Sequence, residues 1–385
     1  MKEAKIMNPR AFARKKIDIV IGTRPEAIKM APLIIELRRR ENFSVRVIST
    51  GQHTDMLKQA LDFFKLKPDA DLAIMKKNQT LDYITSSALL GVGETLDSDR
   101  PDAVLVHGDT TTAMASSLAA FHRRIPVGHV EAGLRSFDMQ IPFPEEMNRV
   151  LIDRLAKWLF APTELASANL RRENAVSGGY LYVTGNTVID ALFIALKLHK
   201  EPCSPVLSPL AGEAPFILMT AHRRESWGKP MERICSALLE VLRRHGEFRA
   251  LVPMHKNPAV RDSMKDILGE NERIILCDPL DYPDFVWSLG RCKIILSDSG
   301  GVQEEASALG KPVVVLRGVT ERPEAVEHGT AILAGTEYDR IVTVADGLLS
   351  DEKKYREIEM RKSGNPFGDG RASERIADIM AETLR

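Results

Sequence analysis

The stretch KIILSDSGGVQEEASALGKPVVVLR, residues 293–317, decides the fold. It opens with a short apolar run, turns at a pair of glycines, continues with a helix-like segment and closes with a second apolar run. Short apolar strands that alternate with helical segments are typical of parallel βαβ units. The glycines let backbone N–H groups approach an anion at the start of the helix. This stretch therefore predicts a parallel α/β fold with an anion site at the turn.

Similar units fill the chain in two series. The segment between the two series, residues 201–215, is dense in Pro, Ser and Gly without periodicity, as expected of a linker. With 385 residues the chain is too long for one ordinary domain. We predict two doubly wound α/β domains with a ligand in the cleft between them. The predicted strands are residues 16–22, 45–50, 102–108, 126–131 and 181–185 in the first series, and 216–222, 250–255, 273–277, 293–298 and 312–317 in the second.

The composition argues against several classes of function. Lys plus Arg and Asp plus Glu number 53 each and the pI is near 7.1, whereas a nucleic-acid binder usually has a basic excess. No apolar run reaches the roughly 18 residues that span a bilayer, and the basic N-terminus lacks the apolar stretch of a secretory signal. We expect a cytoplasmic protein without nucleic-acid or membrane partners. The four cysteines form no C-x-x-C pair, so we expect neither disulfides nor a structural metal.

Polar residues follow the predicted strands of the first half, where ligand sites lie in such folds. After the first strand, Pro25 opens a helix with Arg24 and Lys29 beside it, which could bind an anion or be surface charges flanking a core helix. Where carboxylates are crowded together, at least one of them has a raised pKa, which suits acid/base catalysis at neutral pH. Later strand ends bring together several titratable side chains, which are His107, Asp109, His129, Glu131, Arg135 and Glu145.

Most of these side chains also have a structural interpretation. Asp109 could cap the following helix, and Glu145, after a proline, could simply favour the positive end of its own helix. We expect His129 to pack structurally. Glu131 ends an apolar strand and precedes a turn of small residues, a position that is more often functional than not.

The second half offers a nucleotide site. Residues 222–225 place a histidine and two arginines after its first strand, where they could meet phosphate or form a solvated face, and 255–256 is a weaker candidate. In the opening stretch, Glu304 and Glu305 follow the turn at 299–301 and could accept hydrogen bonds from a ribose. The combination predicts a nucleoside diphosphate. No Gly-Lys-Ser/Thr follows, which argues against a Walker loop, and the one G-x-G lies in a helix-like stretch, which argues against a nicotinamide fingerprint.

A series of motifs, in order, resembles the non-hydrolysing UDP-N-acetylglucosamine 2-epimerases. The motifs are GTRPEAIKMAPLI, TGQH, VHGDTTT, HVEAGLRS, PFPEEMNR, VTGNTVIDA, HRRES, SDSGGVQEEA and GKPVVVLRGVTERPEA. The resemblance implies the GT-B architecture, in which two Rossmann-like domains close on a UDP-sugar, and a homodimer. The implied divisions are a basic tail at 1–16, an N-terminal domain at 17–190, a UDP-binding domain at 191–365 and a last helix at 366–385 that packs back on the first domain.

The resemblance also implies a reaction and its residues. The reaction is inversion at C2 of UDP-N-acetylglucosamine to UDP-N-acetylmannosamine, by anti elimination of UDP to 2-acetamidoglucal and re-addition, without cofactor or metal. Asp109, Glu131 and Glu145 match the family's acid/base carboxylates, and His222 matches a histidine that binds the departing diphosphate. Phe285 matches a residue beside uracil. The other substrate contacts carried over by motif are Arg24, Lys29, Leu280 through its backbone, Ser299, Gly300, Gly301, Glu305 and Arg322.

One departure from the family and several rival functions stay open at this point. Members activated by their own substrate carry a Gln and an Arg where this chain has Asp55 and Asn78, so we expect that form of activation to be absent. A hydrolysing epimerase would release free N-acetylmannosamine, although the full RPEAIKMAPLI helix argues against it. A GT-B glycosyltransferase would need an acceptor groove and fewer carboxylates than this chain has. A sugar-nucleotide sensor would need no catalytic carboxylate. A UDP-diacetamido sugar is the nearest competing substrate.

Overall fold

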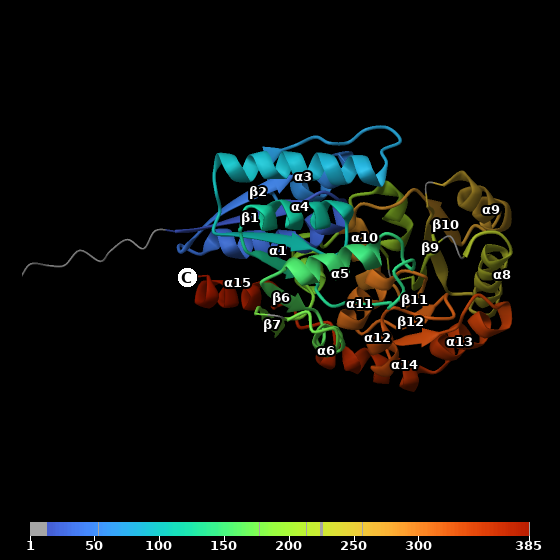
Figure 1. The fold of residues 1–385 in the computed structure, drawn as a ribbon. Helices are drawn as coiled ribbons and strands as arrows, with labels where there is room; N and C mark the ends of the chain where they lie inside the picture. The colour runs from blue at the N-terminus through green and yellow to red at the C-terminus, as the bar shows by residue number, and fades with distance from the viewer. Residues whose placement is uncertain are drawn as a thin grey trace, which may run out of the picture.

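Two parallel sheets, each covered by helices on both faces, lie side by side (Figure 1). The computed structural model describes residues 14–52, 54–176, 178–212, 214–223, 226–255 and 257–384. Most of the predicted basic tail therefore lies outside the described residues. The blue-to-green half of the chain builds one sheet and the yellow-to-red half builds the other (Figure 1). These are the two doubly wound α/β units expected from the sequence.

The first sheet has the strand order β3-β2-β1-β4-β5-β6-β7. Its neighbouring strands pair in parallel, so that Ile19 lies opposite both Val47 and Leu105. Its central strands are buried on both faces, as a parallel sheet between two helical layers requires. The strands are β1 Lys15–Ile21, β2 Phe43–Ser49, β3 Ala70–Asp71, β4 Ala103–His107, β5 Val127–Val130, β6 Trp158–Ala161 and β7 Tyr180–Val183.

The second sheet has the order β10-β9-β8-β11-β12-β13. In each sheet the order reverses beside the first strand, between β1 and β4 and between β8 and β11. Ligands of open α/β sheets bind at such switch points, outside the carboxyl ends of the strands. The strands are β8 Phe216–Thr220, β9 Arg249–Pro253, β10 Ile274–Cys277, β11 Ile294–Ser297, β12 Val313–Val315 and β13 Ala331–Leu333.

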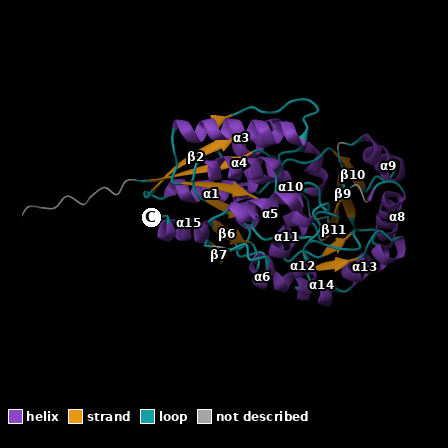
Figure 2. Cartoon of the chain, in the orientation of Figure 1, coloured by secondary structure: helices purple, strands orange, loops and turns teal. Residues whose placement is uncertain are grey.

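Helices connect the strands and form the outer layers (Figure 2). In the first half they are α1 Arg24–Arg39, α2 Thr54–Phe63, α3 Leu81–Ser98, α4 Thr111–His122, α5 Glu145–Leu155, α6 Glu164–Arg172 and α7 Thr187–Leu198. In the second half they are α8 Lys229–Arg244, α9 Pro258–Leu268, α10 Tyr282–Arg291, α11 Gly300–Leu309, α12 Pro323–Glu327, α13 Tyr338–Ser350, α14 Glu352–Met360 and α15 Ala372–Thr383. The predicted linker contains a short 3-10 turn at Pro205–Leu210.

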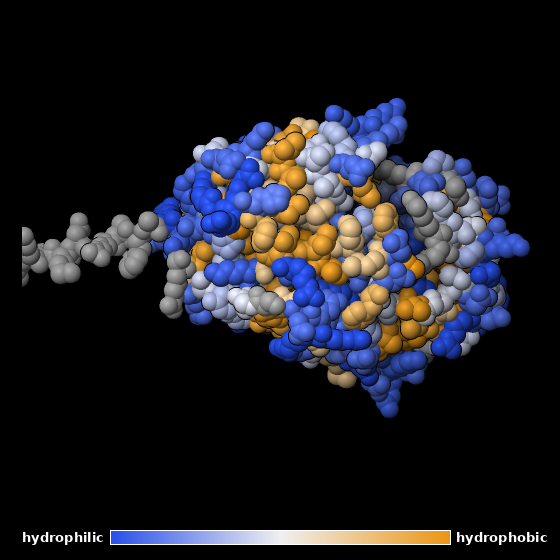
Figure 3. Space-filling model, in the orientation of Figure 1, coloured by the Kyte–Doolittle hydropathy of each residue, from blue (hydrophilic) through white to orange (hydrophobic). Residues whose placement is uncertain are grey.

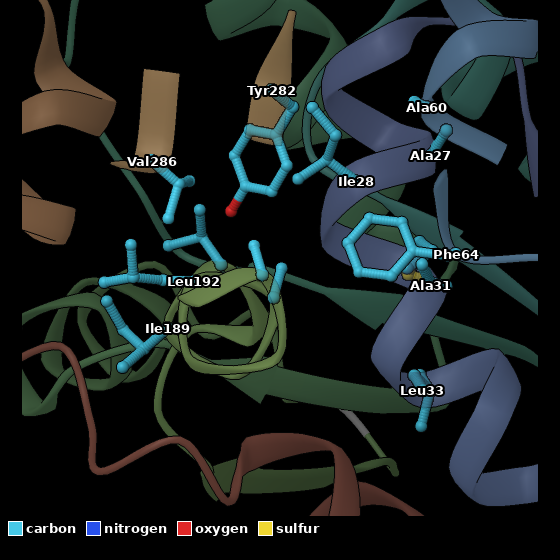
Figure 4. Packing of buried hydrophobic residues seen from close by; sticks show 14 of the residues in the cluster. Ala27, Ile28, Ala31, Leu33, Ala60, Phe64, Ile189, Leu192, Tyr282 and Val286 are labelled. Carbon is cyan, nitrogen blue, oxygen red and sulfur yellow. The ribbon is translucent and has the colours of Figure 1, made fainter. Parts of the chain in front are cut away.

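The hydrophobic core is continuous across the two units. Helix α7 contacts α1 on one side and α10 on the other. Ile28 of α1, Ile189 and Leu192 of α7, and Tyr282 and Val286 of α10 belong to the same buried cluster (Figure 4). Burial of such side chains stabilises each by about 1.5–3 kcal/mol. The shared cluster therefore holds the two sheets in a defined relative position.

The last helix, α15, lies against α1 and α7. The carboxylate of Asp190 accepts the backbone N–H groups of Ala372 and Ser373 at 3.1 and 2.8 Å, at the start of α15. At the other end, Trp158 donates its indole N–H to Thr383 at 2.8 Å. These contacts tie the C-terminal segment to the first unit.

Three short strands, β3, β6 and β13, are absent from the sequence-based prediction. Each has two to four residues, although strands of similar length, such as the three-residue β12, are predicted. Among the described helices, none combines the length and apolarity needed to cross a bilayer. The surface seen in Figure 3 is mainly hydrophilic at its edges, with apolar residues gathered toward the middle of this face.

Candidate active site

A cleft of about 540 Å³ opens between the carboxyl ends of the two sheets. This volume lies within the range of small-ligand sites, about 300–1,000 Å³. A second hollow, of about 640 Å³, is lined by Phe193, Arg375 and residues 362–366 and 368–369, among others, and none of the predicted site residues lines it. The predicted residues that line the cleft are Arg24, Lys29, His222, Leu280, Phe285, Ser299, Gly301 and Glu305.

Helix α1 brings two cations to the cleft. Its start is fixed by a capping box, in which Glu26 accepts the backbone N–H of Thr23 at 2.7 Å. Arg24 then donates to the carbonyl oxygen of Leu280 at 3.2 Å, a contact between the two units. Lys29, one turn later, donates to Glu131 at 2.5 Å. Pro32 lies within α1, which continues to Arg39.

Glu131 lies immediately after β5 with a φ of 70°. This left-handed conformation is uncommon for a residue with a side chain. The carboxylate oxygen Oε1 accepts from Lys29 Nζ and, at 2.7 Å, from Asn186 Nδ2. The other oxygen, Oε2, lies 3.6 Å from the Nε2 atom of His107. Glu131 is therefore a buried carboxylate with one oxygen held by two donors.

The pKa values of Glu131 and Asp109 are displaced in opposite directions. Burial by itself would raise the pKa of Glu131, but the neighbouring positive charges, Lys29 first among them, outweigh it and hold that pKa well below its ordinary value. Burial raises the pKa of Asp109, and the negative charge of Glu131 adds to the effect. Burial also lowers the pKa of His107 to about 3, so its imidazole is neutral at pH 7. Two carboxylates with pKa values displaced in opposite directions are suited to act as a base and an acid.

Asp109 does not cap the helix that follows it. The cap of α4 is Thr110, whose hydroxyl accepts the N–H of Ala113. The Asp109 carboxylate instead accepts from Arg149 at 2.6 Å, and its backbone carbonyl accepts from Asn148 at 2.9 Å. The structural alternative for Asp109 is therefore wrong.

The two glutamates at the start of α5 differ in their surroundings. Glu146 is buried and accepts the backbone N–H groups of Ser136 and Phe137 at 3.0 Å each, so it fixes the loop before α5. Glu145 is half-buried and makes no hydrogen bond or ion pair with any other described residue. Of the two, Glu145 is the one whose carboxylate is available to a ligand.

His129 and Arg135 belong to a separate buried cluster. His129 is bonded to Asp153 at 2.6 Å and to the carbonyl of Gly108 at 2.7 Å. Arg135 pairs with Asp153 at 2.7 Å and Glu173 at 2.8 Å, and its side chain is fully buried. The structural role expected of His129 is confirmed. Arg135 also makes its ion pairs within this cluster and not with Asp109, Glu131 or Glu145.

The start of α11 also lines the cleft and offers backbone N–H groups to an anion. Gly300 and Gly301 form its first turn after Ser299, where backbone N–H groups have no partner within the helix. A Cβ atom placed on Gly301 would meet nothing within 4 Å. The space in front of this turn is therefore free for a ligand.

His222 is partly exposed and lies beside this anion site. Its ring is stacked on His255 with 6.1 Å between centroids, and its Nδ1 atom is 3.5 Å from Asp298. Burial lowers the pKa of His222 despite the negative charge of Asp298. A bound diphosphate would raise the pKa again, because it favours the charged imidazolium. Arg224, Glu225 and Lys256, also considered from the sequence, lie outside the described residues.

Glu304 and Glu305 occupy different environments. Glu305 lines the cleft and accepts from the Tyr282 hydroxyl at 3.3 Å. Burial and the neighbouring Glu304 raise the pKa of Glu305 to about 8. Glu304 is bonded instead to Arg322 and to Asn186. Of the two, Glu305 is the one that lines the cleft.

Asn186 is the site residue that the sequence analysis misses. It belongs to the VTGNTVIDA motif and follows a predicted strand, like the other candidates. From the sequence, however, an asparagine directly before a helix is most simply interpreted as an N-cap. It does cap α7 through Val188. Its contacts with two buried glutamates depend on how the two sheets come together, which the sequence pattern does not show.

A candidate cation site lies at the far end of α7. One ligand atom from each of His199, Cys203 and Asp284 lies within 4.8 Å of the others. Asp284, however, already accepts from His199 at 2.9 Å and from the backbone N–H groups of Cys203 and Ser204 at 2.8 and 2.9 Å. These bonds attach the predicted linker to α10. This structural role explains why the three side chains lie together.

Comparisons with known proteins agree with this arrangement. A family model described as UDP-N-acetylglucosamine 2-epimerase matches residues 35–381. The UDP-N-acetylglucosamine 2-epimerase of Escherichia coli K12 is 48% identical over 372 residues, which cover 95% of this chain and 98% of that protein. The enzyme of the same name from Bacillus subtilis 168 is 48% identical over 363 residues, 94% of each chain.

A solved structure extends the likeness to three dimensions. The UDP-GlcNAc 2-epimerase of Neisseria meningitidis, in a crystal structure bound to UDP-GlcNAc, has a TM-score of 0.88 and 44% identity, covering 96% of this chain and 100% of that chain. The GT-B-like fold expected from the resemblance is confirmed. The chain belongs to the UDP-N-acetylglucosamine 2-epimerase family.

Proposed function

We propose that this protein interconverts UDP-N-acetylglucosamine and UDP-N-acetylmannosamine without net hydrolysis. The observation that carries the proposal is a pair of carboxylates beside a cleft with an anion site. Glu131 is buried and paired with Lys29, Asp109 is half-buried and paired with Arg149, and their pKa values are displaced in opposite directions. Epimerisation at C2 needs one group that accepts a proton and one that supplies it. The names of relatives at 48% identity support the same activity.

The lining of the cleft supports a UDP-sugar as the ligand. Phe285 offers an apolar wall for a uracil ring, and Glu305 a carboxyl group for a ribose. The start of α11, residues 299–301, offers N–H donors to a diphosphate. The sugar would then extend toward Lys29 and Glu131. A relative of known structure is described as bound to UDP-GlcNAc.

The proposed mechanism is anti elimination followed by re-addition. A carboxylate accepts the proton from C2, the electrons form the C1–C2 double bond of 2-acetamidoglucal, and the C1–O bond breaks with release of UDP. Re-addition of UDP at C1 and protonation of C2 on the opposite face give the epimer. Glu131 is the carboxylate kept ionised, Asp109 and Glu145 are the candidates for the second face, and His222 and Arg322 stabilise the charge on the departing diphosphate.

The products of a single incubation test the proposal. Purified protein is incubated with UDP-N-acetylglucosamine, without added metal or nicotinamide, and the mixture is separated by ion-exchange chromatography. We expect UDP-N-acetylmannosamine in equilibrium with the substrate, with no accumulation of free sugar. Stoichiometric UDP and free N-acetylmannosamine would identify a hydrolysing enzyme instead.

A homodimer and a cytoplasmic location, both expected from the sequence, remain predictions. Light scattering after size-exclusion chromatography, compared with the 42.8 kDa chain mass, would test the first. Fractionation of cells that express the protein would test the second.

A further inference from the structure

Asn186 lies where the two units meet, before α7, and is 2% exposed. Its single Nδ2 atom donates to Glu131 Oε1 and to Glu304 Oε2, at 2.7 Å in both cases. Glu131 follows a strand of the first sheet, and Glu304 lies on α11 of the second unit. One amide group therefore bridges a carboxylate from each half of the molecule.

Every polar atom of the Asn186 side chain is used. A primary amide carries two N–H donors and one acceptor oxygen. The two donors go to the two glutamates, and the oxygen accepts the N–H of Val188 at 3.1 Å. The backbone N–H donates to the carbonyl of Phe367 at 2.7 Å. The amide is thus held from three sides, so its donors have a fixed direction.

These bonds distinguish the two oxygens of Glu131. Oε1 accepts from Lys29 and Asn186, whereas Oε2 accepts no hydrogen bond from the described residues and has the neutral His107 at 3.6 Å. A Cβ on Gly108 would come within 3.4 Å of Oε2, so the glycine leaves room on that side. Oε2 is the oxygen free to exchange a proton.

We infer that Asn186 is a positioning residue for the proposed reaction, which fixes Glu131 through Oε1 and leaves Oε2 directed at the substrate. The inference rests on the proposed function. Asn186 also separates two buried carboxylates that would otherwise repel each other directly, and Arg322 neutralises Glu304 on its far side. The charged or titratable groups that influence Glu131 from the surrounding elements are Lys29 of α1, His107 of β4, Asp109, Glu304 of α11 and Arg322 before α12.

Two substitutions test this role and keep the cap of α7. Asn186→Asp preserves the shape and capping ability but replaces the two donors with an acceptor, and Asn186→Ser caps without adding charge. As a matched control, Asp351→Ser exchanges one cap residue for another at α14, away from the cleft. For each variant, kcat and KM are measured with UDP-N-acetylglucosamine across pH, together with the Kd for UDP and the Tm.

We expect both Asn186 variants to lose roughly 10- to 100-fold in kcat, because a displaced catalytic group costs about this much, while the Kd for UDP changes by less than about threefold. The acid limb of the kcat profile should move to higher pH, since loss of N–H donors raises the pKa of a carboxylate. The control variant should match the wild type in kcat.

Two results would overturn the inference. The first is a kcat within about twofold of wild type in both Asn186 variants. The second is a loss of kcat that is accompanied by equal losses in UDP affinity and Tm, which would mark Asn186 as a purely structural residue. A wild-type protein that leaves UDP-N-acetylglucosamine unchanged would refute the proposed function and this inference together, whereas an active wild type with fully active variants refutes the inference alone.

Discussion

Replacement of Lys29 by methionine should destabilise the protein in a pH-dependent way. The Lys29 Nζ and Glu131 Oε1 atoms are 2.5 Å apart, and the two side chains are only 16% and 7% exposed. Loss of one partner of a buried ion pair costs roughly 3–5 kcal/mol, because the other charge is left uncompensated. Asn186 still donates to Glu131 in the variant, so we expect the lower part of this range, about 3–4 kcal/mol near pH 7.

The pH dependence follows from the directions of the pKa shifts. The pKa of Glu131 lies below its ordinary value of 4.5 in the folded protein, so its pairing stabilises the fold above pH 4.5 and this contribution is lost as pH falls through the folded value. The pKa of Lys29 is raised above 10.5, so its contribution is lost only in strong alkali. In Lys29→Met, burial raises the pKa of Glu131, and mild acid protonates the carboxylate and relieves part of the cost.

Urea denaturation at about pH 5 and about pH 7.5 measures the effect. The difference in the free energy of unfolding between wild type and Lys29→Met should be smaller at the lower pH. Lys16→Met is the matched control, because Lys16 pairs with Asp99 at the surface, with side chains 49% and 53% exposed, and such pairs contribute about 0–1 kcal/mol. A cost for Lys29→Met that equals the control, or that does not change with pH, would refute the reasoning.

Four further predictions concern ligand binding and turnover. Glu131→Gln should abolish turnover and leave the Kd for UDP within about threefold, because it removes the proton carrier and keeps the shape; near-normal kcat would contradict the assignment. Gly301→Ala should weaken UDP binding by at least about tenfold in calorimetry with an unchanged Tm, because its Cβ would enter the open space before α11, whereas Gly347→Ala, equally free of close contacts, should bind UDP normally. UDP affinity should fall as pH rises through about 8, where Glu305 ionises, and Glu305→Gln should bind UDP with a flatter pH dependence. Velocity with UDP-N-acetylmannosamine should be hyperbolic without added UDP-N-acetylglucosamine; a strict requirement for the latter would show that the activation is present.

The prediction of hyperbolic velocity depends on the residues at positions 55 and 78. The side chain of Asp55 lies outside the described residues. Asn78 is exposed, with a φ of 57°, in the loop before α3. The kinetic measurement is therefore the test of activation.

The sequence predicts the longer strands and the strand-end residues because both depend on local patterns. Apolar runs such as 102–108 mark β4, and the polar residues after each run reach one edge of a parallel sheet in any such fold. The four-residue segment WLFA at β6 is missed, although the equally short YLYV at β7 is predicted. A local pattern also does not show which side chains from different loops will pair, so the pairing of Arg135 with Asp153 and Glu173 is not foreseen.

Residues that act between the two units are the least predictable. Arg24 donates to a carbonyl 256 positions away, and Asn186 donates to Glu304, 118 positions away. Nothing in the local sequence around Asn186 separates this role from helix capping. Only the packing of α7 against both units, through the shared apolar cluster, brings these partners together.

Proton NMR in heavy water tests the central claim most directly. Purified protein is mixed with UDP-N-acetylglucosamine, with no metal or nicotinamide added, and the C2 proton of each UDP-linked sugar is followed with time. Reversible epimerisation through removal of that proton predicts deuterium at C2 of both UDP-N-acetylglucosamine and UDP-N-acetylmannosamine. Accumulation of free N-acetylmannosamine with UDP, or a spectrum that does not change, would contradict it.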